Sequence, residues 1–194
     1  MPYVPSHVRT VLDVGCASGH FGRALKDARP GVDIDGIEPD EQAAAEARGV
    51  YRTVLVGTFP GVTPDGSYDA IVCNDVLEHM VDPWGAVAEL RHHLNPDGVV
   101  VASIPNMRYW PVLRGLLAGR WDYADEGVLD RTHLRWFTKA SMRELFTDAG
   151  FEIDAVERLT GLRGGPALRA IGVLARQQVQ DVLTKQYVVV ARAA

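Results

Sequence analysis

Several features that mark large classes of protein are scarce or absent in this sequence of 194 residues. Its two cysteines, Cys16 and Cys73, are too few for a disulfide framework, which favours a reducing compartment such as the cytoplasm. No apolar run reaches the roughly 18 residues of a membrane-spanning helix, and the first residues lack the pattern of a signal peptide. The formal net charge is −5, whereas a free nucleic-acid binder is usually basic. We therefore expect a cytoplasmic protein without nucleic-acid or membrane partners.

What the sequence does have is an alternation of short apolar runs with helical patterns. Strands are predicted at 10–14, 32–37, 51–56, 68–74, 99–104, 151–158 and 186–192. Helices are predicted at 21–29, 40–48, 83–94, 141–149 (with Ser141 as N-cap) and 167–183, the last with an apolar face that includes Leu168 and Ile171. This alternation predicts an α/β fold, a Rossmann-like sheet of seven mostly parallel strands with helices on both faces. We expect one domain, 1–194, with 106–137 inserted after the fifth strand as a cap.

The first predicted strand runs into VLDVGCASG, a loop whose glycines let a ligand approach the backbone. A dinucleotide-binding turn needs glycine where Ala17 and His20 stand, and a phosphate-binding P-loop needs a lysine that is missing. Asp13 instead places a carboxylate beside the loop, which suits a cation. Glu38 ends the second strand, where an acidic residue commonly accepts hydrogen bonds from a ribose diol. The ligand expected from these residues has a ribose, no phosphate and a positive charge, as S-adenosylmethionine does.

Four stretches in order, VLDVGCASG, IEPD, YDAIVCNDVLEHMVDP and LDRTHLRWFTKASMRELFTDAGF, resemble class I S-adenosylmethionine-dependent methyltransferases. The similarity is to a broad bacterial branch that acts on small molecules and glycans, and the closing QYVVVAR resembles the last strand of that family. The resemblance implies that Asp13 lies near the amino group of the methionine moiety, that Glu38 holds the ribose and that Asn74 and Asp75 border the methionine part. The cofactor-binding residues that it implies are Asp13, Gly15, Cys16, Ala17, Gly19, Glu38, Pro39, Thr58, Phe59, Asn74 and Asp75.

The sequence departs from this family at two places. Where many members have an aspartate for the adenine amine, this chain has VGTFPG, so Thr58 or Phe59 stands there, and Phe59 could stack on the base. Nine residues precede Thr10, whereas most members carry helices that cover the cofactor. A homodimer or a partner subunit would then cover this open side.

The NDVLEHM stretch and His133 are the candidates for chemistry. If NDVLEHM is helical, Asp75, Glu78 and His79 share one face, where they could hold a divalent metal or present a general base. The more conservative interpretation is that Glu78 and His79 hydrogen-bond to nearby backbone and fix the loop, and likewise that His133 ties the cap to the sheet. Our candidates for a catalytic base are His79 and His133, and we predict no metal.

The cap, 106–137, gathers six of the 15 aromatic residues and five arginines, which suits the binding of a flat acceptor. We therefore predict methyl transfer from S-adenosylmethionine to a small-molecule acceptor, at a hydroxyl oxygen of a sugar-linked or secondary-metabolite type. An amine acceptor, a non-catalytic cofactor-binding subunit and a dinucleotide-dependent oxidoreductase are the alternatives, the last disfavoured by Ala17 and His20.

Overall fold

The computed structural model describes residues 3–162 and 173–194, in which strands and helices alternate. The strands are β1 (Thr10–Val14), β2 (Asp33–Glu38), β3 (Thr53–Val56), β4 (Tyr68–Asn74), β5 (Leu94–Pro105), β6 (Phe151–Gly161) and β7 (Thr184–Ala193). The helices are α1 (His20–Ala28), α2 (Glu41–Ala47), α3 (Pro83–Leu90), α4 (Trp110–Leu117), α5 (Lys139–Asp148) and α6 (Val173–Leu183). Single 3₁₀ turns lie at Leu77–His79 and Arg91–His93.

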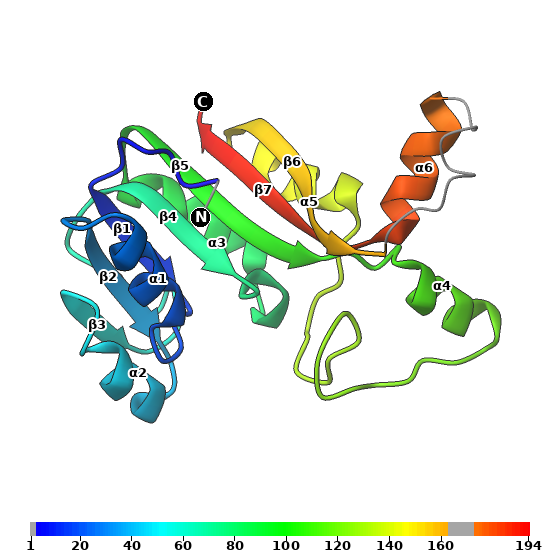
Figure 1. The fold of residues 1–194 in the computed structure, drawn as a ribbon, viewed down its shortest axis with the longest axis horizontal. Helices are drawn as coiled ribbons and strands as arrows, with labels where there is room; N and C mark the ends of the chain where they lie inside the picture. Colours follow the sequence, from blue (N-terminus) through cyan, green and yellow to red (C-terminus); the bar gives the residue numbers. More distant parts are fainter. Residues whose placement is uncertain (1–2, 163–172) are drawn as a thin grey trace.

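The seven strands form one sheet in the order β3-β2-β1-β4-β5-β7-β6 (Figure 1). The first five strands are parallel, and β7 runs antiparallel between β5 and β6. The predicted Rossmann-like fold with a mostly parallel sheet is therefore confirmed. The strand order reverses direction between β1 and β4, the position at which open α/β sheets bind ligands beyond their carboxyl ends.

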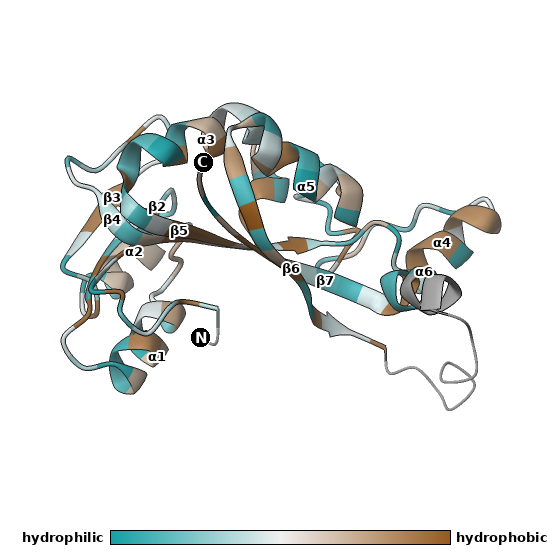
Figure 2. Ribbon diagram, turned by 90° about the horizontal axis from the view of Figure 1, so that it is seen from above, coloured by the Kyte–Doolittle hydropathy of each residue, from teal (hydrophilic) through white to brown (hydrophobic). Residues whose placement is uncertain are grey.

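Helices cover both faces of this sheet, each over its own apolar cluster. Leu25 of α1 and Ala44 and Ala47 of α2 are buried against one face. Val87 of α3 and Phe146 of α5 are buried against the other. Figure 2 shows α1 and α2 on one side of the sheet, α3 and α5 on the opposite side, and hydrophobic residues along β5 between them. This burial of strands on both faces explains the continuous apolar runs in the sequence.

Several predicted boundaries are wrong. The third helix ends at Leu90, and β5 begins at Leu94 because that residue pairs with Tyr68 ahead of a β-bulge. The helix predicted from Ser141 begins at Lys139, since Thr138 is its N-cap and forms a reciprocal capping box with Ser141. The first part of the helix predicted at 167–183 lies outside the described residues.

The cap leaves the sheet at the end of β5 and returns at α5, and its two ends lie side by side. Met107 N donates to Phe137 O at 2.7 Å, and Asn106 pairs with Phe137 in an isolated bridge. The Asn106 side chain is fully buried and donates to the carbonyls of Asp181 and Thr184, each at 2.9 Å. The cap contains the helix α4, which lies away from the sheet (Figure 1).

Candidate functional site

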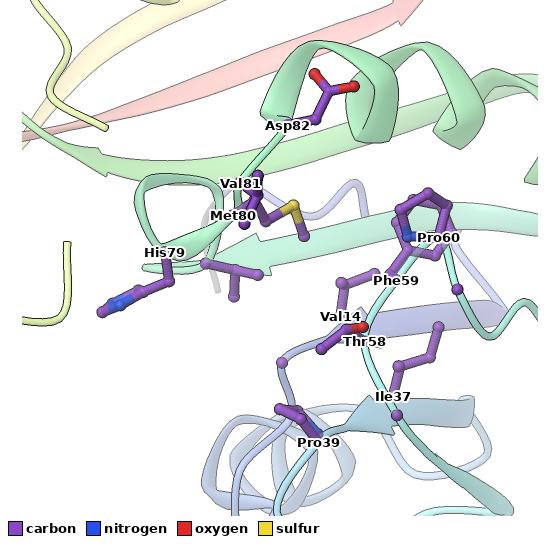
Figure 3. Close-up of a pocket in the computed structure, with 14 residues that line it drawn as sticks. Val14, Ile37, Pro39, Thr58, Phe59, Pro60, His79, Met80, Val81 and Asp82 are labelled. Atoms are coloured by element: carbon purple, nitrogen blue, oxygen red, sulfur yellow. The ribbon is translucent and has the colours of Figure 1, made fainter. Parts of the chain in front are cut away.

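A cavity of about 420 Å³ opens at the carboxyl ends of β1, β2 and β3, beside the loop that follows β4. Its lining comes from four chain segments: Val14, Gly15, Ile37, Pro39, Gly57, Thr58, Phe59, Pro60, Gly61, Val76, His79, Met80, Val81 and Asp82. Figure 3 shows Val14, Ile37, Phe59 and Met80 directed toward one another across this space, with His79 and Asp82 farther out. The cavity thus has an apolar centre and polar groups at its margins, as small-molecule sites commonly do.

Gly15 forms the floor of the cavity where β1 becomes a loop. Its φ of +72° lies in the left-handed region that favours glycine, and an added Cβ would be 2.5 Å from Cγ2 of Val76. Gly15 N and Cys16 N both donate to Ile37 O, at 2.8 and 3.0 Å. The loop after β1 is therefore held against the end of β2, and a side chain at residue 15 would push Val76 away from it.

Glu38 strengthens the same junction through its carboxylate. Oε2 accepts a hydrogen bond from Ala17 N at 2.8 Å, and Oε1 accepts one from Asp40 N at 3.0 Å. Each carboxylate oxygen has further lone-pair capacity. Glu38 can consequently fix the glycine loop and still accept hydrogen bonds from a ligand hydroxyl.

Asp13 is buried behind the loop, with a relative exposure of 1%. The Tyr51 hydroxyl donates to its carboxylate at 2.5 Å and itself accepts a hydrogen bond from Gly22 N at 3.0 Å. Burial raises the pKa of Asp13 to about 7, the Tyr51 hydrogen bond opposes the shift and the charge of Glu38 adds to it. In this structure Asp13 therefore connects β1 to α1 through Tyr51, and it does not line the cavity.

The predicted cofactor residues divide into two sets. Those that line the cavity are Gly15, Pro39, Thr58 and Phe59. Those that lie outside its lining are Asp13, Cys16, Ala17, Gly19, Glu38, Asn74 and Asp75. Cys16 packs beneath the loop, where burial and the charge of Asp13 raise the pKa of its thiol to about 12. A thiol with such a pKa is a packing group and not a nucleophile.

Asn74 and Asp75 lie at the exposed end of β4. Asp75 has a φ of +54°, and its backbone N–H donates to Ser103 O at 3.2 Å. Its carboxylate also accepts a hydrogen bond from the side chain of Gln186 on β7. Asp75 thus joins the loop after β4 to β5 and β7.

The NDVLEHM stretch forms only a single 3₁₀ turn, Leu77–His79, so the condition under which Asp75, Glu78 and His79 would share a helix face is not met. Glu78 points inward with a relative exposure of 1%, whereas His79 is exposed beside the cavity. No hydrogen bond to either carboxylate oxygen of Glu78 comes from the described residues. Burial raises its pKa to about 8, and the charge of Asp75 adds to the shift. Burial therefore favours the protonated form of Glu78.

The structure brings both predicted catalytic histidines together. The rings of His79 and His133 lie edge to face, with centroids 4.7 Å apart. His133 Nδ1 lies 3.1 Å from Val128 O, and its Nε2 lies 3.9 Å from Oε1 of Glu78. Burial lowers the pKa of His133. Since a carbonyl only accepts, Nδ1 carries the proton and His133 Nε2 is an acceptor in the neutral ring.

Residues of the cap complete the surroundings of His79. Its Nδ1 lies 3.3 Å from Thr132 O and 3.2 Å from Thr132 Oγ1. The cap is also fastened to the turn itself, since Leu134 N and Arg135 N donate to Glu78 O at 2.8 and 3.0 Å. The interpretation that His133 itself ties the cap to the sheet differs from the structure, in which His133 Nδ1 contacts Val128 O within the cap and Leu134 and Arg135 make the connection to the turn. Glu78, His79 and His133 offer ligand atoms within 4.8 Å of one another, a set that could hold a divalent cation, although we predict none.

Sequence reasoning missed the apolar lining and the polar partners of the motif residues. Val14, Ile37, Val76 and Met80 line the cavity as ordinary strand and loop residues, with no chemical signature of their own. Their position next to the glycine loop, Glu38 and NDVLEHM was the available signal. Thr132 and Tyr51 lie far along the chain from their partners His79 and Asp13, and no local pattern connects them.

Comparisons with known proteins show the family to which this chain belongs. Residues 4–156 match the model of a family described as "Methyltransferase domain". The chain belongs to the class I S-adenosylmethionine-dependent methyltransferases. Over 155 residues it is 30% identical to a ubiquinone biosynthesis O-methyltransferase of Psychrobacter arcticus, covering 74% of this chain and 59% of that one. The corresponding protein of Rickettsia canadensis is 26% identical over 157 residues, covering 77% and 65% of the two chains. The chain thus spans less than two thirds of the length of these relatives.

A solved structure supports the fold of the methyltransferase. Magnesium protoporphyrin IX methyltransferase of Synechocystis, crystallised with S-adenosylhomocysteine, superposes with a TM-score of 0.64 at 16% identity, covering 95% of this chain and 74% of that one. At this identity the likeness concerns the fold alone. No helix within the described parts of the chain is long and apolar enough to cross a bilayer.

The residues of the cavity fit the family's cofactor, S-adenosylmethionine. Phe59, Ile37 and Met80 offer apolar surfaces for a base, and the volume lies in the range of small-ligand sites, roughly 300–1,000 Å³. Gly15 presents backbone without a side chain, and Glu38 keeps acceptor capacity beside it. Carboxylates near the cavity, Glu38, Asp75 and Asp82, suit a positively charged ligand.

Proposed function

We propose that this protein transfers a methyl group from S-adenosylmethionine to a hydroxyl oxygen of a small molecule. The observation that carries the proposal is the placement of His79, which lines the cofactor-sized cavity and is held by the cap. The two relatives named ubiquinone biosynthesis O-methyltransferases support an oxygen acceptor, of the kind found on a hydroxylated ring. The small-molecule acceptor would lie between the cavity and the cap.

In this proposal Gly15, Pro39, Thr58 and Phe59 contact the cofactor, and Glu38 accepts hydrogen bonds from its ribose hydroxyls. S-adenosylmethionine, when bound, supplies a methyl group already activated by a positive sulfur. The protein's own contribution is to align the acceptor and to exclude water from the cavity. The apolar lining and the cap serve these two purposes.

His79 is the proposed general base. When the acceptor oxygen gains a methyl group, its hydroxyl proton must leave, and Nε2 of His79 takes it. The ring becomes an imidazolium, whose Nδ1–H faces the oxygens of Thr132. His133 packs edge-on against His79 and holds the ring in place, so it contributes orientation and not a second proton transfer.

The aromatic side chains of the cap offer the acceptor a flat surface. Trp121 packs edge to face with Trp136 at 5.4 Å and with Tyr123 at 6.3 Å between centroids. All three are exposed, by 36–56%. They lie in the segment whose Leu134 and Arg135 contact the Glu78–His79 turn, which favours binding of a ring or a sugar face next to the cavity.

Calorimetric titration with S-adenosylhomocysteine, on wild type and Glu38→Ala, tests the cofactor half of the proposal. We expect micromolar binding that the substitution weakens by about 1–3 kcal/mol, the scale of a lost buried hydrogen-bond partner. Asp65→Ala, a change in a loop outside the cavity, is the matched control and should bind as wild type does.

Turnover with labelled S-adenosylmethionine and a panel of catechols, phenols, sugars and amines tests the acceptor half. Methylation of oxygen acceptors supports the proposal, and methylation confined to amines would replace it with the amine alternative. Binding without turnover, accompanied by co-purification of a partner, would favour the non-catalytic subunit. A defined dimer mass in solution would support the homodimer alternative.

A further inference from the structure

The tautomer of His79 is determined by hydrogen bonds that come from the cap. Two oxygens of Thr132 contact Nδ1 of His79, the carbonyl at 3.3 Å and the hydroxyl at 3.2 Å. A carbonyl can only accept, whereas a hydroxyl can either donate or accept. The hydroxyl is therefore the one group here that could reverse the direction of the hydrogen bond.

Asp130 removes that freedom. Its Oδ1 accepts a hydrogen bond from the Thr132 hydroxyl at 2.6 Å and another from Thr132 N at 2.8 Å. The hydrogen bonds from Thr132 lower the pKa of Asp130, so its carboxylate is ionised and can only accept. The single proton of the Thr132 hydroxyl is thus directed to Asp130, and its oxygen presents a lone pair to His79.

We propose that Asp130, acting through the Thr132 hydroxyl, fixes the proton of His79 on Nδ1 and leaves Nε2 free to accept a proton. Asp130 and Thr132 are then positioning residues, since neither lines the cavity. The statement about the tautomer stands on the geometry alone, and the use of Nε2 as the base rests on the proposed function. On the proposed function, the base would then depend on the cap, because the cap residues Asp130 and Thr132 set its tautomer.

Removal of the Asp130 carboxylate should change the tautomer of His79. In Asp130→Ala the Thr132 hydroxyl is released and can donate to Nδ1, so that the ring can carry its proton on Nε2 instead. In the double variant Asp130→Ala/Thr132→Val that donor is gone, and the Thr132 carbonyl again requires a proton on Nδ1. Adding Thr132→Val to Asp130→Ala should therefore restore the Nδ1–H tautomer of His79.

Ring-nitrogen NMR on the full chain with ¹⁵N-labelled histidine tests this proposal without any acceptor, at a pH at which His79 is neutral. The His79 signals are assigned by their loss in His79→Gln. We expect a protonated Nδ1 and an unprotonated Nε2 in wild type, in Thr132→Ser and in the double variant, and a mixture of tautomers in Asp130→Ala. The amide spectrum of each variant shows whether it is folded.

Two results would overturn the proposal: a wild-type His79 with its proton on Nε2, or an Asp130→Ala spectrum identical to that of wild type. A mixture that persists in the double variant would also contradict it, because the effect would then come from distortion of the turn. Failure of the proposed function looks different. If His79 has the Nδ1–H tautomer but S-adenosylhomocysteine does not bind, the positioning stands and the methyltransferase proposal fails.

Discussion

Two carboxylates near the site, Asp13 in β1 behind the glycine loop and Glu78 in the loop after β4, are buried to the same extent, and yet they differ in their partners. Asp13 and Glu78 both have a relative exposure of 1%. Asp13 accepts a hydrogen bond from Tyr51, whose oxygen in turn holds the start of α1, so this side of the site is satisfied and structural. Glu78 receives no hydrogen bond from the described residues and faces His133 at 3.9 Å. The hydrogen bonds of Asp13 and Tyr51 hold the loop after β1 in place. In the loop after β4, the Glu78 carboxylate has no hydrogen-bond partner among the described residues and lies close to the proposed base, His79.

If the loop after β4 supplies the general base, His79→Ala should reduce activity more than any other substitution considered below affects its own measured quantity. We expect kcat to fall by about 10²–10⁴, the usual contribution of a general base, with little change in the affinity for S-adenosylhomocysteine. Steady-state rates and calorimetry on the same preparation measure the two quantities. If kcat falls by less than about threefold in both His79→Ala and His133→Ala, neither histidine is a general base. The loop after β4 would then have a structural role only, as the loop after β1 has.

Because Glu78 is buried without a hydrogen-bond partner among the described residues, ionising it should destabilise the folded protein, and stability should therefore depend on pH. Because its pKa in the folded protein is about 8 and an unfolded glutamate has one near 4.5, the folded chain alone holds the proton between these values. Stability linked to Glu78 is complete below about pH 4.5 and is lost as the pH rises to about 8. Relative to Glu78→Gln, wild type should therefore lose up to about 4 kcal/mol between pH 5 and pH 8.

Urea unfolding of both chains at the two pH values measures this difference. The opposite trend, in which wild type gains stability with rising pH, would mean that Glu78 is ionised and paired with a charged His133 or a cation. The contrast between the two buried carboxylates would then disappear.

Asp13→Ala tests the other loop and should give the smallest effect of the three. Removal of the carboxylate leaves the buried Tyr51 hydroxyl without its acceptor, which costs about 1–3 kcal/mol in the free energy of unfolding. Asp13→Asn is the matched control, because its amide oxygen can still accept from Tyr51. If Asp13→Ala is as stable as Asp13→Asn at pH 5, the Tyr51 hydrogen bond contributes nothing and Asp13 is free for the ligand role that the family resemblance implies.

The fold was predictable from the sequence because its strands are buried on both faces and so read as continuous apolar runs. Gly15, Pro39, Thr58, Phe59 and His79, which line the cavity, could be singled out from the sequence because each lies in a short motif next to a strand end. The inward turn of Glu78 was not predictable, because three residues are too few for a periodic pattern.

The hydrogen bonds between Tyr51 and Asp13 and between Thr132 and His79 could not be predicted from the sequence, for a different reason. Tyr51 and Thr132 reach their partners through the tertiary fold, from positions 38 and 53 residues away. Such contacts are set by the packing of α1 and the cap against the sheet, and no local spacing encodes them.

The closed base of the cap has a consequence for how such proteins diversify. Asn106 and Phe137 lie side by side, so the chain leaves the sheet and re-enters it at nearly one point. A segment of different length or sequence could be exchanged between these two residues with only a small change in closure entropy, since that entropy grows slowly with loop length. If the cap binds the acceptor as proposed, gene recombination at this junction would change the acceptor preference and leave β1, β2 and the glycine loop as they are.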